Sequence, residues 1–357
     1  MHVTVAICTW NRAEQLDGTL TSLAGVTIPA GVTWDVIVAN NNSTDPTEEV
    51  LDAHAARLPL TRLFVPRQGK SYALNEIVDR LRGDLVLWTD DDVVFAEDWI
   101  ASYIDAARRW PEAAFFGGRI IPRFLSAEPD WLRPAWQILA GVYAERELGD
   151  EPIPFSSSKL PYGANMAVRV GVQKQYRYNS ELGRRGNLLL SCEETELAKQ
   201  WLIDGHVGMW VPQSRVEHMI PPERLELDYI RRFFFDLARS AHLRRKTSEP
   251  LTRFFRGTWY ACRAIGYRVV RASHSQTTET RRWMKYLVRN SYCWGRVRAE
   301  WGGLPRWLEP PPTKRPDQAK PASATRPESC TPPAATADIR PFVAASSQPA
   351  RRIFRAA

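Results

Sequence analysis

Apolar runs of strand length alternate with segments of helical periodicity through the first hundred residues. The runs are bounded by turn residues, whereas the segments between them repeat an apolar residue every three or four positions. Strands are predicted at residues 3–8, 36–39, 63–65 and 85–88. Helices are predicted at residues 12–24, 45–57, 70–81 and 97–109. This alternation predicts an α/β fold with a mostly parallel central sheet and helices on both faces.

The pattern becomes less regular in the next part of the chain. Proline and tryptophan are frequent in residues 122–161, which indicates a long excursion from the sheet. Further strands are predicted at residues 162–169, 207–211 and 215–218, and a helix at residues 193–204. Helical periodicity then continues over residues 225–246, 250–272 and 281–300.

Composition changes again at the C-terminal end. Residues 305–357 contain 11 of the 26 prolines of the chain, among Ala, Ser, Thr and Arg. Such a segment buries too little apolar surface to offset the conformational entropy lost on ordering, so we expect it to be disordered. The domain organisation predicted is therefore a sheet domain at residues 1–222, a basic helical region at 223–304 and a Pro-rich tail at 305–357.

Charge is distributed unevenly over these parts. Residues 1–221 carry 21 Lys and Arg against 29 Asp and Glu, a net charge of −8. Residues 222–300 carry 18 against 7, a net charge of +11. This asymmetry suggests peripheral contact of the basic part with an anionic partner, such as a membrane surface or a phosphorylated acceptor, or with nucleic acid. A solvated arginine-rich helical face explains the same charge equally well.

Cysteine usage and hydropathy bear on the cellular compartment in which the protein is expected. The five cysteines show no paired CxxC spacing, so we expect isolated thiols rather than a disulfide framework or a zinc site. The chain begins directly with the strand at residues 3–8, without the basic and apolar regions of a signal peptide. No apolar run reaches the length of a membrane span. A cytoplasmic protein is expected, with peripheral contact at the inner face of the membrane as an open addition.

Three consecutive acids, Asp90, Asp91 and Asp92, follow the fourth predicted strand. In a parallel sheet, ligands bind beyond the carboxyl ends of the strands, so these acids lie where a ligand is expected. Adjacent carboxylates repel one another unless a cation compensates, and Mg2+ or Mn2+ commonly binds one or two carboxylates together with substrate phosphates. A divalent-metal clamp on a nucleoside diphosphate is therefore predicted here, against the alternative of a solvated acidic loop.

Two further strand ends carry polar side chains. The first strand is followed by Thr9-Trp10-Asn11-Arg12, without the glycines of a dinucleotide-binding loop. The second is followed by Asn40-Asn41-Asn42-Ser43-Thr44-Asp45. These side chains can bind a nucleotide, although Ser43 or Asp45 can equally cap the next helix.

Glu193, Glu194 and His218 are the remaining candidates for chemistry. The two acids open the helix at residues 193–204, where the helix dipole stabilises negative charge, and either can serve as a general base toward an acceptor hydroxyl. His218 follows a short strand and is a candidate metal ligand, although a lone histidine is more often structural.

In this order, these segments resemble the family-2 glycosyltransferases, which have the GT-A fold. The resemblance spans roughly residues 3–225. It is carried by Thr9-Trp10-Asn11-Arg12, Val38-Ala39-Asn40-Asn41-Asn42-Ser43-Thr44-Asp45, Gly69-Lys70-Ser71-Tyr72-Ala73-Leu74-Asn75, Trp88-Thr89-Asp90-Asp91-Asp92, Tyr162-Gly163-Ala164-Asn165-Met166-Ala167, Cys192-Glu193-Glu194-Thr195-Glu196-Leu197 and Val216-Glu217-His218. Each motif is weak alone, but seven in the family's order are specific.

The resemblance implies a nucleotide site. Thr9, Asn11 and Arg12 match the segment that contacts the base and the phosphates. Asn40, followed by Asn42, stands where members usually have an aspartate that binds the base. Because an amide both donates and accepts hydrogen bonds, this departure leaves the identity of the base open.

It also implies the roles of the charged residues around the donor phosphates. Lys70 lies in the segment that flanks the nucleotide, where a cation meets a phosphate. Asp90 and Asp92 match the DxD acids, with Asp91 between them. Asp92 is the expected direct metal ligand and Asp90 binds sugar or ribose, with a part in the metal site.

The catalytic base and a further metal ligand follow from the last two motifs. Glu194, preceded by Glu193, matches the aspartate that acts as the base in members, with a side chain one methylene longer. His218 matches a position that ligates the metal in some members.

The reaction expected is therefore an inverting, metal-dependent transfer of a sugar from a nucleotide-diphosphate donor to a sugar, lipid-linked or other hydroxyl acceptor, in cell-surface glycan or glycolipid assembly. Two alternatives remain. One is a non-enzymatic basic scaffold that binds anionic lipid or nucleic acid, although a nucleic-acid partner is not expected. The other is a different metal-dependent nucleotide-using transferase.

Overall fold

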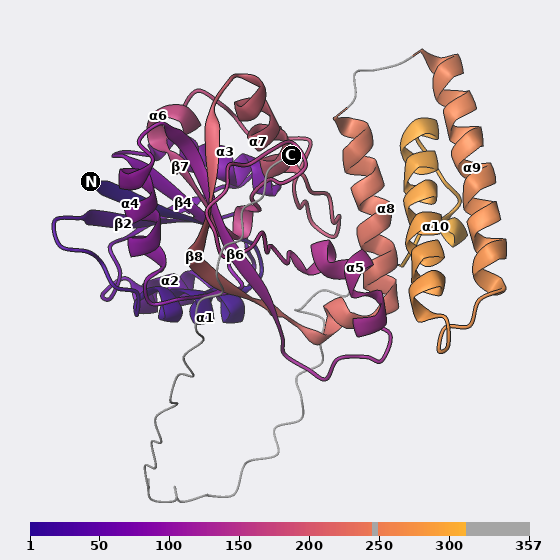
Figure 1. Cartoon of the computed structure of the whole chain (residues 1–357), viewed down its shortest axis with the longest axis horizontal. Helices are drawn as coiled ribbons and strands as arrows, with labels where there is room; N and C mark the ends of the chain where they lie inside the picture. Colours follow the sequence, from indigo (N-terminus) through magenta and orange to yellow (C-terminus); the bar gives the residue numbers. More distant parts are fainter. Residues whose placement is uncertain (245–248, 312–357) are drawn as a thin grey trace, which may run out of the picture. The chain divides into compact units, whose positions relative to one another are not determined.

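Eight strands form one sheet within the residues that the computed structural model describes, which are 1–244 and 249–311 (Figure 1). The strand order is β3-β2-β1-β4-β7-β6-β8-β5. The strands are β1 (His2–Thr9), β2 (Thr33–Asn40), β3 (Leu60–Phe64), β4 (Leu85–Thr89), β5 (Val93–Phe95), β6 (Ala113–Phe124), β7 (Met166–Arg169) and β8 (Val207–Ile220). Strands β3, β2, β1 and β4 run parallel, β6 pairs with β8 in parallel, and the other neighbours are antiparallel.

Helices follow most strands of the parallel half, and the last three long helices follow one another without intervening strands. They are α1 (Ala13–Leu23), α2 (Thr47–His54), α3 (Lys70–Arg80), α4 (Trp99–Arg109), α5 (Trp136–Leu139), α6 (Val170–Gln173), α7 (Glu193–Ile203), α8 (Leu227–Leu243), α9 (Pro250–Ala272) and α10 (Thr280–Trp301). Short 3-10 turns are η1 (Arg133–Ala135), η2 (Ala140–Tyr143), η3 (Gly163–Asn165), η4 (Pro222–Leu225) and η5 (Arg306–Leu308).

Alternation along the central strands produces two cores, one on each face of the sheet. Val3, Val5 and Ile7 of β1 point to the face that packs against α1, α2 and α4. Ala6 points to the other face, where it packs with residues of α3 and α7. The expected sheet with helices on both faces is confirmed.

A third core joins the excursion to the C-terminal helices. Its residues come from the segment η1–α5–η2, from the end of β8 and from α8 and α10. Helix α10 lies between α8 and α9 (Figure 1). None of the helices in residues 1–244 and 249–311 combines the length and the apolar character that crossing a bilayer requires.

Several element boundaries differ from the sequence-based predictions. Strands β5 and β6 were not predicted, and residues 207–211 and 215–218 belong to one continuous strand, β8. Strand β6 was missed because Gly117 and Gly118 interrupt its pattern. A Cβ on Gly118 would lie 2.3 Å from the carbonyl oxygen of Ser214, so the close approach of β8 excludes a side chain there.

Two other predicted segments are only partly matched. The strand expected at residues 162–169 begins with the turn η3, so that β7 covers its second half. The expected tail at 305–357 lies mostly outside the described residues, and its described part contains η5.

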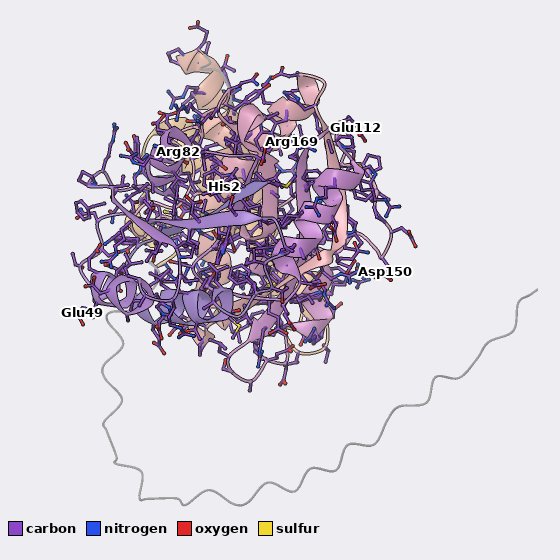
Figure 2. All side chains as sticks on the ribbon, turned by 90° about the vertical axis from the view of Figure 1, so that its left-hand side faces the viewer. His2, Glu49, Arg82, Glu112, Asp150 and Arg169 are labelled. Carbon is purple, nitrogen blue, oxygen red and sulfur yellow. The ribbon has the colours of Figure 1, made fainter. Side chains whose placement is uncertain are left out.

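Chain order creates a crevice at one edge of the sheet. The chain runs from β1 outward to β2 and β3 and then returns to β4 on the other side of β1. At such a reversal the loops after β1 and β4 diverge and leave room for a ligand. The opposite edge holds His2 at the start of β1, with Arg82 just before β4 and Arg169 at the end of β7 (Figure 2).

Candidate active site

The three acids lie in the loop between β4 and β5, beside the crevice. Asp91 and Asp92 are buried, and Asp90 is half-buried. Buried carboxylates this close need positive partners. Two cations come from other parts of the chain: Lys70 faces Asp90, and Arg12 faces both Asp91 and Asp92.

Arg12 precedes α1 and binds two of the acids at once. Its Nη1 lies 2.5 Å from Asp91 Oδ1 and its Nη2 lies 2.7 Å from Asp92 Oδ2. Burial raises the pKa of Asp91 to about 6 despite the opposing charge of Arg12. Burial acts the same way on Asp92, but Arg12 and Arg224 hold the pKa of Asp92 well below its usual value. Asp92 is therefore the firmly ionised acid of the pair.

His218 comes to Asp92 from β8, which pairs with β5. Its Nδ1 lies 2.8 Å from the carbonyl oxygen of Tyr143, and its Nε2 lies 3.2 Å from Asp92 Oδ2. Arg224, from η4, places Nη1 3.0 Å from His218 Nε2 and Nη2 3.0 Å from Asp92 Oδ2. Because a carbonyl only accepts and a guanidinium only donates, this network assigns the proton to Nδ1 and leaves the Nε2 lone pair toward Asp92.

Lys70 links the acid loop to α7. It opens α3, and its Nζ lies 2.7 Å from Asp90 Oδ1 and 3.5 Å from Glu193 Oε1. Burial would lower the pKa of Lys70, but Asp90 and Glu193 raise it well above its usual value. Conversely, burial would raise the pKa of Asp90, and Lys70 lowers it below the usual value. The ammonium group stays charged at every physiological pH.

Glu194 occupies the first turn of α7, next to the buried Glu193. Burial and the charge of Glu193 raise the pKa of Glu194 to about 8, against an opposing contribution from Lys70. Gly163, in η3, lies across from it: a Cβ there would be 3.7 Å from Glu194 Cγ. A carboxyl group with this pKa exchanges protons near neutral pH, as a general base must.

The asparagine loops are held together by their own amides. Asn11 has the left-handed φ of 51°, its backbone N–H donates to Ser43 Oγ, and its Oδ1 accepts from the Thr44 backbone. Asn40 donates to Glu48 and accepts from the Ser43 backbone, so its amide is used within the fold. Thr9 and Asn11 line the cavity described below, whereas Asn40 and Asn42 do not.

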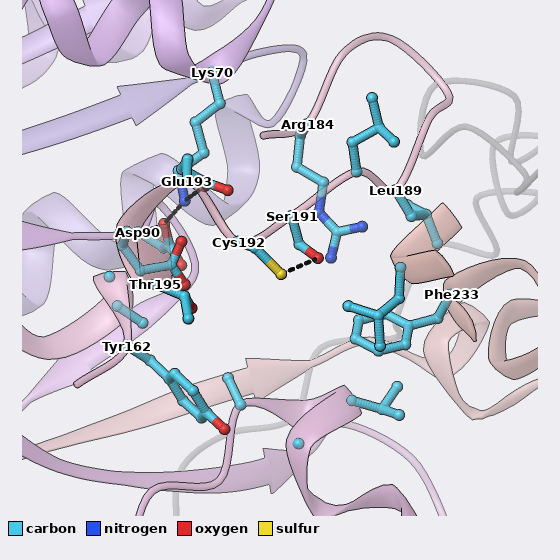
Figure 3. Close-up of a pocket in the computed structure, with 18 of the residues that line it drawn as sticks. Lys70, Asp90, Tyr162, Arg184, Leu189, Ser191, Cys192, Glu193, Thr195 and Phe233 are labelled. Atoms are coloured by element: carbon cyan, nitrogen blue, oxygen red, sulfur yellow. Dashed lines mark hydrogen bonds and ion pairs between the residues drawn. The ribbon is translucent and has the colours of Figure 1, made fainter. Parts of the chain in front are cut away.

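One cavity of about 640 Å³ connects these residues. Lys70, Asp90 and Glu193 form one wall, and Arg184, Leu189 and Phe233 lie together on another (Figure 3). Of the residues predicted from sequence, it brings together Thr9, Asn11, Arg12, Lys70, Asp90, Asp91, Asp92, Glu193, Glu194 and His218. Its apolar side is formed by Ile138, Val142, Leu189, Leu190, Tyr229, Phe233, Phe234 and Leu237.

Three arginines of the cavity, Arg146, Arg184 and Arg224, were missed by the sequence analysis, and the last two lie close to its candidate residues or its apolar wall. Arg224 follows the Pro-Pro pair after β8, and the only available signal was its place six residues after His218. Arg184 lies in the loop before α7, with its guanidinium over the Phe233 ring and Nη1 buried without a hydrogen-bond partner. No local pattern marked either residue, because both reach the site through loops.

The described residues hold no cluster of three or more His, Cys, Asp and Glu side chains with metal-site geometry. Asp92 and His218 provide two potential ligands, and Asp92 Oδ1 is buried without a hydrogen-bond partner. A free carboxylate oxygen beside an imidazole lone pair suits a divalent cation whose other ligands are substrate phosphates and water.

Comparison with known proteins finds similarity to glycosyltransferases. Residues 4–160 match the profile of Glycosyl transferase family 2. The chain is 25% identical to the succinoglycan biosynthesis protein ExoM of Rhizobium meliloti over 65% of this chain and 72% of that protein. It is 24% identical to the glucosyl-dolichyl phosphate glucuronosyltransferase of Haloferax volcanii over 64% of this chain and 73% of that protein.

A solved structure agrees in fold. The mannosyltransferase PcManGT from Pyrobaculum calidifontis, in complex with GDP-Man and Mn2+, superposes with a TM-score of 0.53 at 16% identity, over 84% of this chain and 87% of that one. The predicted GT-A fold is confirmed, with its curled, mostly parallel sheet. Together, the profile match and the two glycan-building relatives identify residues 4–160 as a family-2 glycosyltransferase domain and the chain as a glycosyltransferase.

Proposed function

We propose that the chain transfers a sugar from a nucleoside-diphosphate donor to an acceptor hydroxyl, with inversion at the anomeric carbon and with a divalent metal ion. The observation that supports this most is the shared cavity: a carboxyl group with a pKa of about 8, Glu194, faces the same space as the acid triplet and its cations. A base on one side and charge-neutralising groups on the other are what a single displacement requires.

Asp92 and His218 would hold the metal ion, with Asp90 close by. The unpartnered Asp92 Oδ1 and the Nε2 lone pair of His218 support this assignment. With Mn2+ or Mg2+ held by these residues, charge on the leaving diphosphate would be neutralised. The bound Mn2+ of PcManGT, a protein with the same fold, is consistent with a metal of this kind.

Arg12, Lys70 and Arg224 would meet the donor phosphates. All three line the cavity and are now paired with carboxylates. Arginine binds phosphate through two parallel hydrogen bonds, and lysine acts as a point charge. Of the residues predicted to bind the nucleotide, Thr9, Asn11 and Asp91 line the cavity and would contact the nucleoside. Asn40 and Asn42 remain predicted contacts of the nucleobase. They would reach it only if the loop after β2 rearranges.

Glu194 would act as the base. The acceptor hydroxyl gives its proton to the Glu194 carboxylate while its oxygen forms a bond to the anomeric carbon. The bond from that carbon to the diphosphate oxygen breaks, and the electron pair leaves with the nucleoside diphosphate. One displacement inverts the configuration. Glu193, paired with Lys70, would position α7 and the ammonium group rather than take the proton.

The acceptor would carry an apolar or lipid portion. The cavity wall formed by α8 is apolar, and Arg184 stands at its border with an unpartnered Nη1. This combination suits a phosphate next to a hydrocarbon chain. The two relatives named in succinoglycan biosynthesis and in glucosyl-dolichyl phosphate chemistry point to the same class, cell-surface glycan or glycolipid assembly.

Donor turnover tests the proposal. The purified chain is incubated with Mn2+ and a panel of nucleoside-diphosphate sugars, and release of nucleoside diphosphate is measured with and without EDTA. The anomeric configuration of the product is determined by NMR. Inversion, together with dependence on metal, supports the proposal. Retention of configuration, release of pyrophosphate, or full turnover in excess EDTA contradicts it.

A further inference from the structure

Helix α9 has the opposite distribution of charged and apolar side chains from an ordinary surface helix. Its 23 residues include five arginines and no Asp, Glu or Lys. In an amphipathic helix of a soluble domain, the apolar stripe faces the core and the charges face water. Here several arginines point to the neighbouring helix, and the large apolar side chains point away from the protein.

The inner face of α9 packs on α10 through small and charged residues. Ala264 is fully buried, and a Cβ on Gly257 would lie 2.0 Å from the Trp301 ring nitrogen, so the helices approach closely there. Arg253 donates to the Ala299 carbonyl and Arg256 pairs with Glu300. This face is satisfied by α10 and determines which side of α9 is left outward.

The outer face carries an apolar stripe, which Thr258 interrupts between Phe255 and Cys262. Leu251 is 67% exposed, Phe255 63%, Ile265 56% and Val269 66%. These positions recur at helical spacing along the whole of α9, and the exposed Cys262 lies in the middle of the stripe. A monomeric protein rarely exposes a contiguous apolar patch without a partner.

Positive charge borders this stripe. Arg263 and Arg268 are exposed on α9, on either side of the apolar positions. No acidic residue of α9 opposes them. An apolar centre with arginines at its edges matches a lipid surface, in which side chains enter the acyl boundary and guanidinium groups meet phosphates.

We propose that α9 docks the enzyme on an anionic lipid bilayer, with Leu251, Phe255, Ile265 and Val269 in the acyl boundary and Arg263 and Arg268 at the headgroups. The surface goes beyond the proposed reaction and connects to it through Phe234 of α8. This ring contributes both to the catalytic cavity and to an aromatic groove of about 350 Å³ that Trp259, Arg263 and Tyr267 of α9 also line. The outer face of α9 itself is separated from the cavity by α10 and α8.

Vesicle flotation of the full chain tests the docking surface without donor, metal or acceptor, so its result is independent of the proposed reaction. Vesicles of phosphatidylcholine alone are compared with vesicles that contain phosphatidylglycerol, at low and high salt. The triple variant Leu251→Ser, Phe255→Ser, Val269→Ser removes three of the four large apolar side chains of the stripe. The matched control is Phe64→Ser with Ile203→Ser, which removes exposed apolar side chains on β3 and α7.

The wild type and the control are expected to float with the anionic vesicles, and the triple variant is expected to bind at least about tenfold more weakly. Arg263→Gln with Arg268→Gln should weaken binding mainly to anionic vesicles, since each basic residue near such a surface contributes. Unchanged melting temperatures show that the variants fold.

A polarity-sensitive fluorophore on Cys262 provides a second reading. Its emission should shift to the blue on adding anionic vesicles, and a Cys262→Ser protein treated in parallel should show no such shift. Absence of wild-type binding at low salt overturns the proposal, as does equal binding of the triple variant. A dimer that the triple variant dissociates, without any vesicle binding by the wild type, would assign the stripe to a second copy of the chain and also overturn it.

Discussion

His218 and Asp92 face each other as two acceptors, with Nε2 and Oδ2 3.2 Å apart. They tolerate this distance because the guanidinium group of Arg224 donates to both atoms, 3.0 Å from each. A cation thus lies where the imidazole lone pair and the carboxylate converge. In the proposed metal site, this arginine occupies the position that the metal ion would take.

Arg224→Gln tests this relationship. Without the guanidinium, Asp92 keeps only Arg12 as a permanent cation, so the metal-free protein should lose roughly 1–3 kcal/mol of stability, as expected for a hydrogen bond to a charged group. The more negative site should then bind Mn2+ better. We expect a lower melting temperature in EDTA and a larger rise on adding Mn2+ than in the wild type. Arg123→Gln, which removes an exposed arginine paired with Glu217, serves as the control. Equal Mn2+ effects in both proteins would contradict the assignment.

Asp92→Asn should lower turnover by about 10²-fold or more, because the amide loses the charge that binds the metal and the transition-state charge is then less well compensated. Asp92 is buried and bound by two arginines, so the variant should also melt at a lower temperature. Donor binding measured by calorimetry over a range of Mn2+ concentrations separates the two effects. Asp105→Asn, on the exposed side of α4, should leave all three quantities unchanged. Normal Mn2+ dependence in Asp92→Asn would remove Asp92 from the metal site.

Arg184→Gln addresses the acceptor. Arg184 lies at the border of the apolar wall, and its Nη1 has no partner among the described residues. If it binds a phosphate of a lipid-linked acceptor, the variant should raise the KM for that acceptor by about tenfold or more, the size of one charge-assisted contact. The KM for the donor should not change. A short-chain acceptor without phosphate is the comparison substrate, and an equal rise in its KM would contradict phosphate binding.

The fold was predictable where the hydrophobic pattern of a single strand or helix was sufficient to identify that element. Strands β1, β2 and β4 are apolar runs buried on both faces, and their periodicity identified them. Strand β6 escaped because its glycines are required by the approach of β8, a contact between distant segments. A contact between segments far apart in the sequence produces no periodic hydrophobic pattern in either segment.

The site was predictable to the same extent. Asp90 to Asp92 could be found because they follow a recognisable strand, and Glu194 because it opens a helix within a family motif. Arg224 and Arg184 could not, since nothing around them in sequence indicates that their loops fold over the cavity. Asn40 was assigned by its place after β2, yet hydrogen bonds to Glu48 and Ser43 occupy its amide.

Glu194→Gln should lower kcat by roughly 10²–10⁴, the range for loss of a general base, and leave donor affinity largely unchanged. In the wild type, kcat should rise with pH up to about 8, because the carboxyl group must be ionised to take the proton. The variant should lose this dependence. Glu193→Gln is the matched control: it is expected to disturb Lys70 and donor binding rather than the pH profile. A silent Glu194→Gln beside an inactive Glu193→Gln would assign the base to Glu193.

The same substitution should stabilise the free protein, and the effect should depend on pH. The pKa of Glu194 is raised from 4.5 to about 8 in the folded state. Below pH 4.5 both states hold the proton, so wild type and variant should differ little. Between pH 4.5 and about 8 the unfolded chain releases the proton while the folded protein retains it, and wild-type stability falls with rising pH. Glutamine cannot ionise, so the advantage of Glu194→Gln in melting temperature should grow through this interval and level off above it. Thermal melts of both proteins in EDTA across the pH range measure it. A constant difference at every pH would show that the carboxyl group titrates normally and that its neighbours do not prepare it as a base.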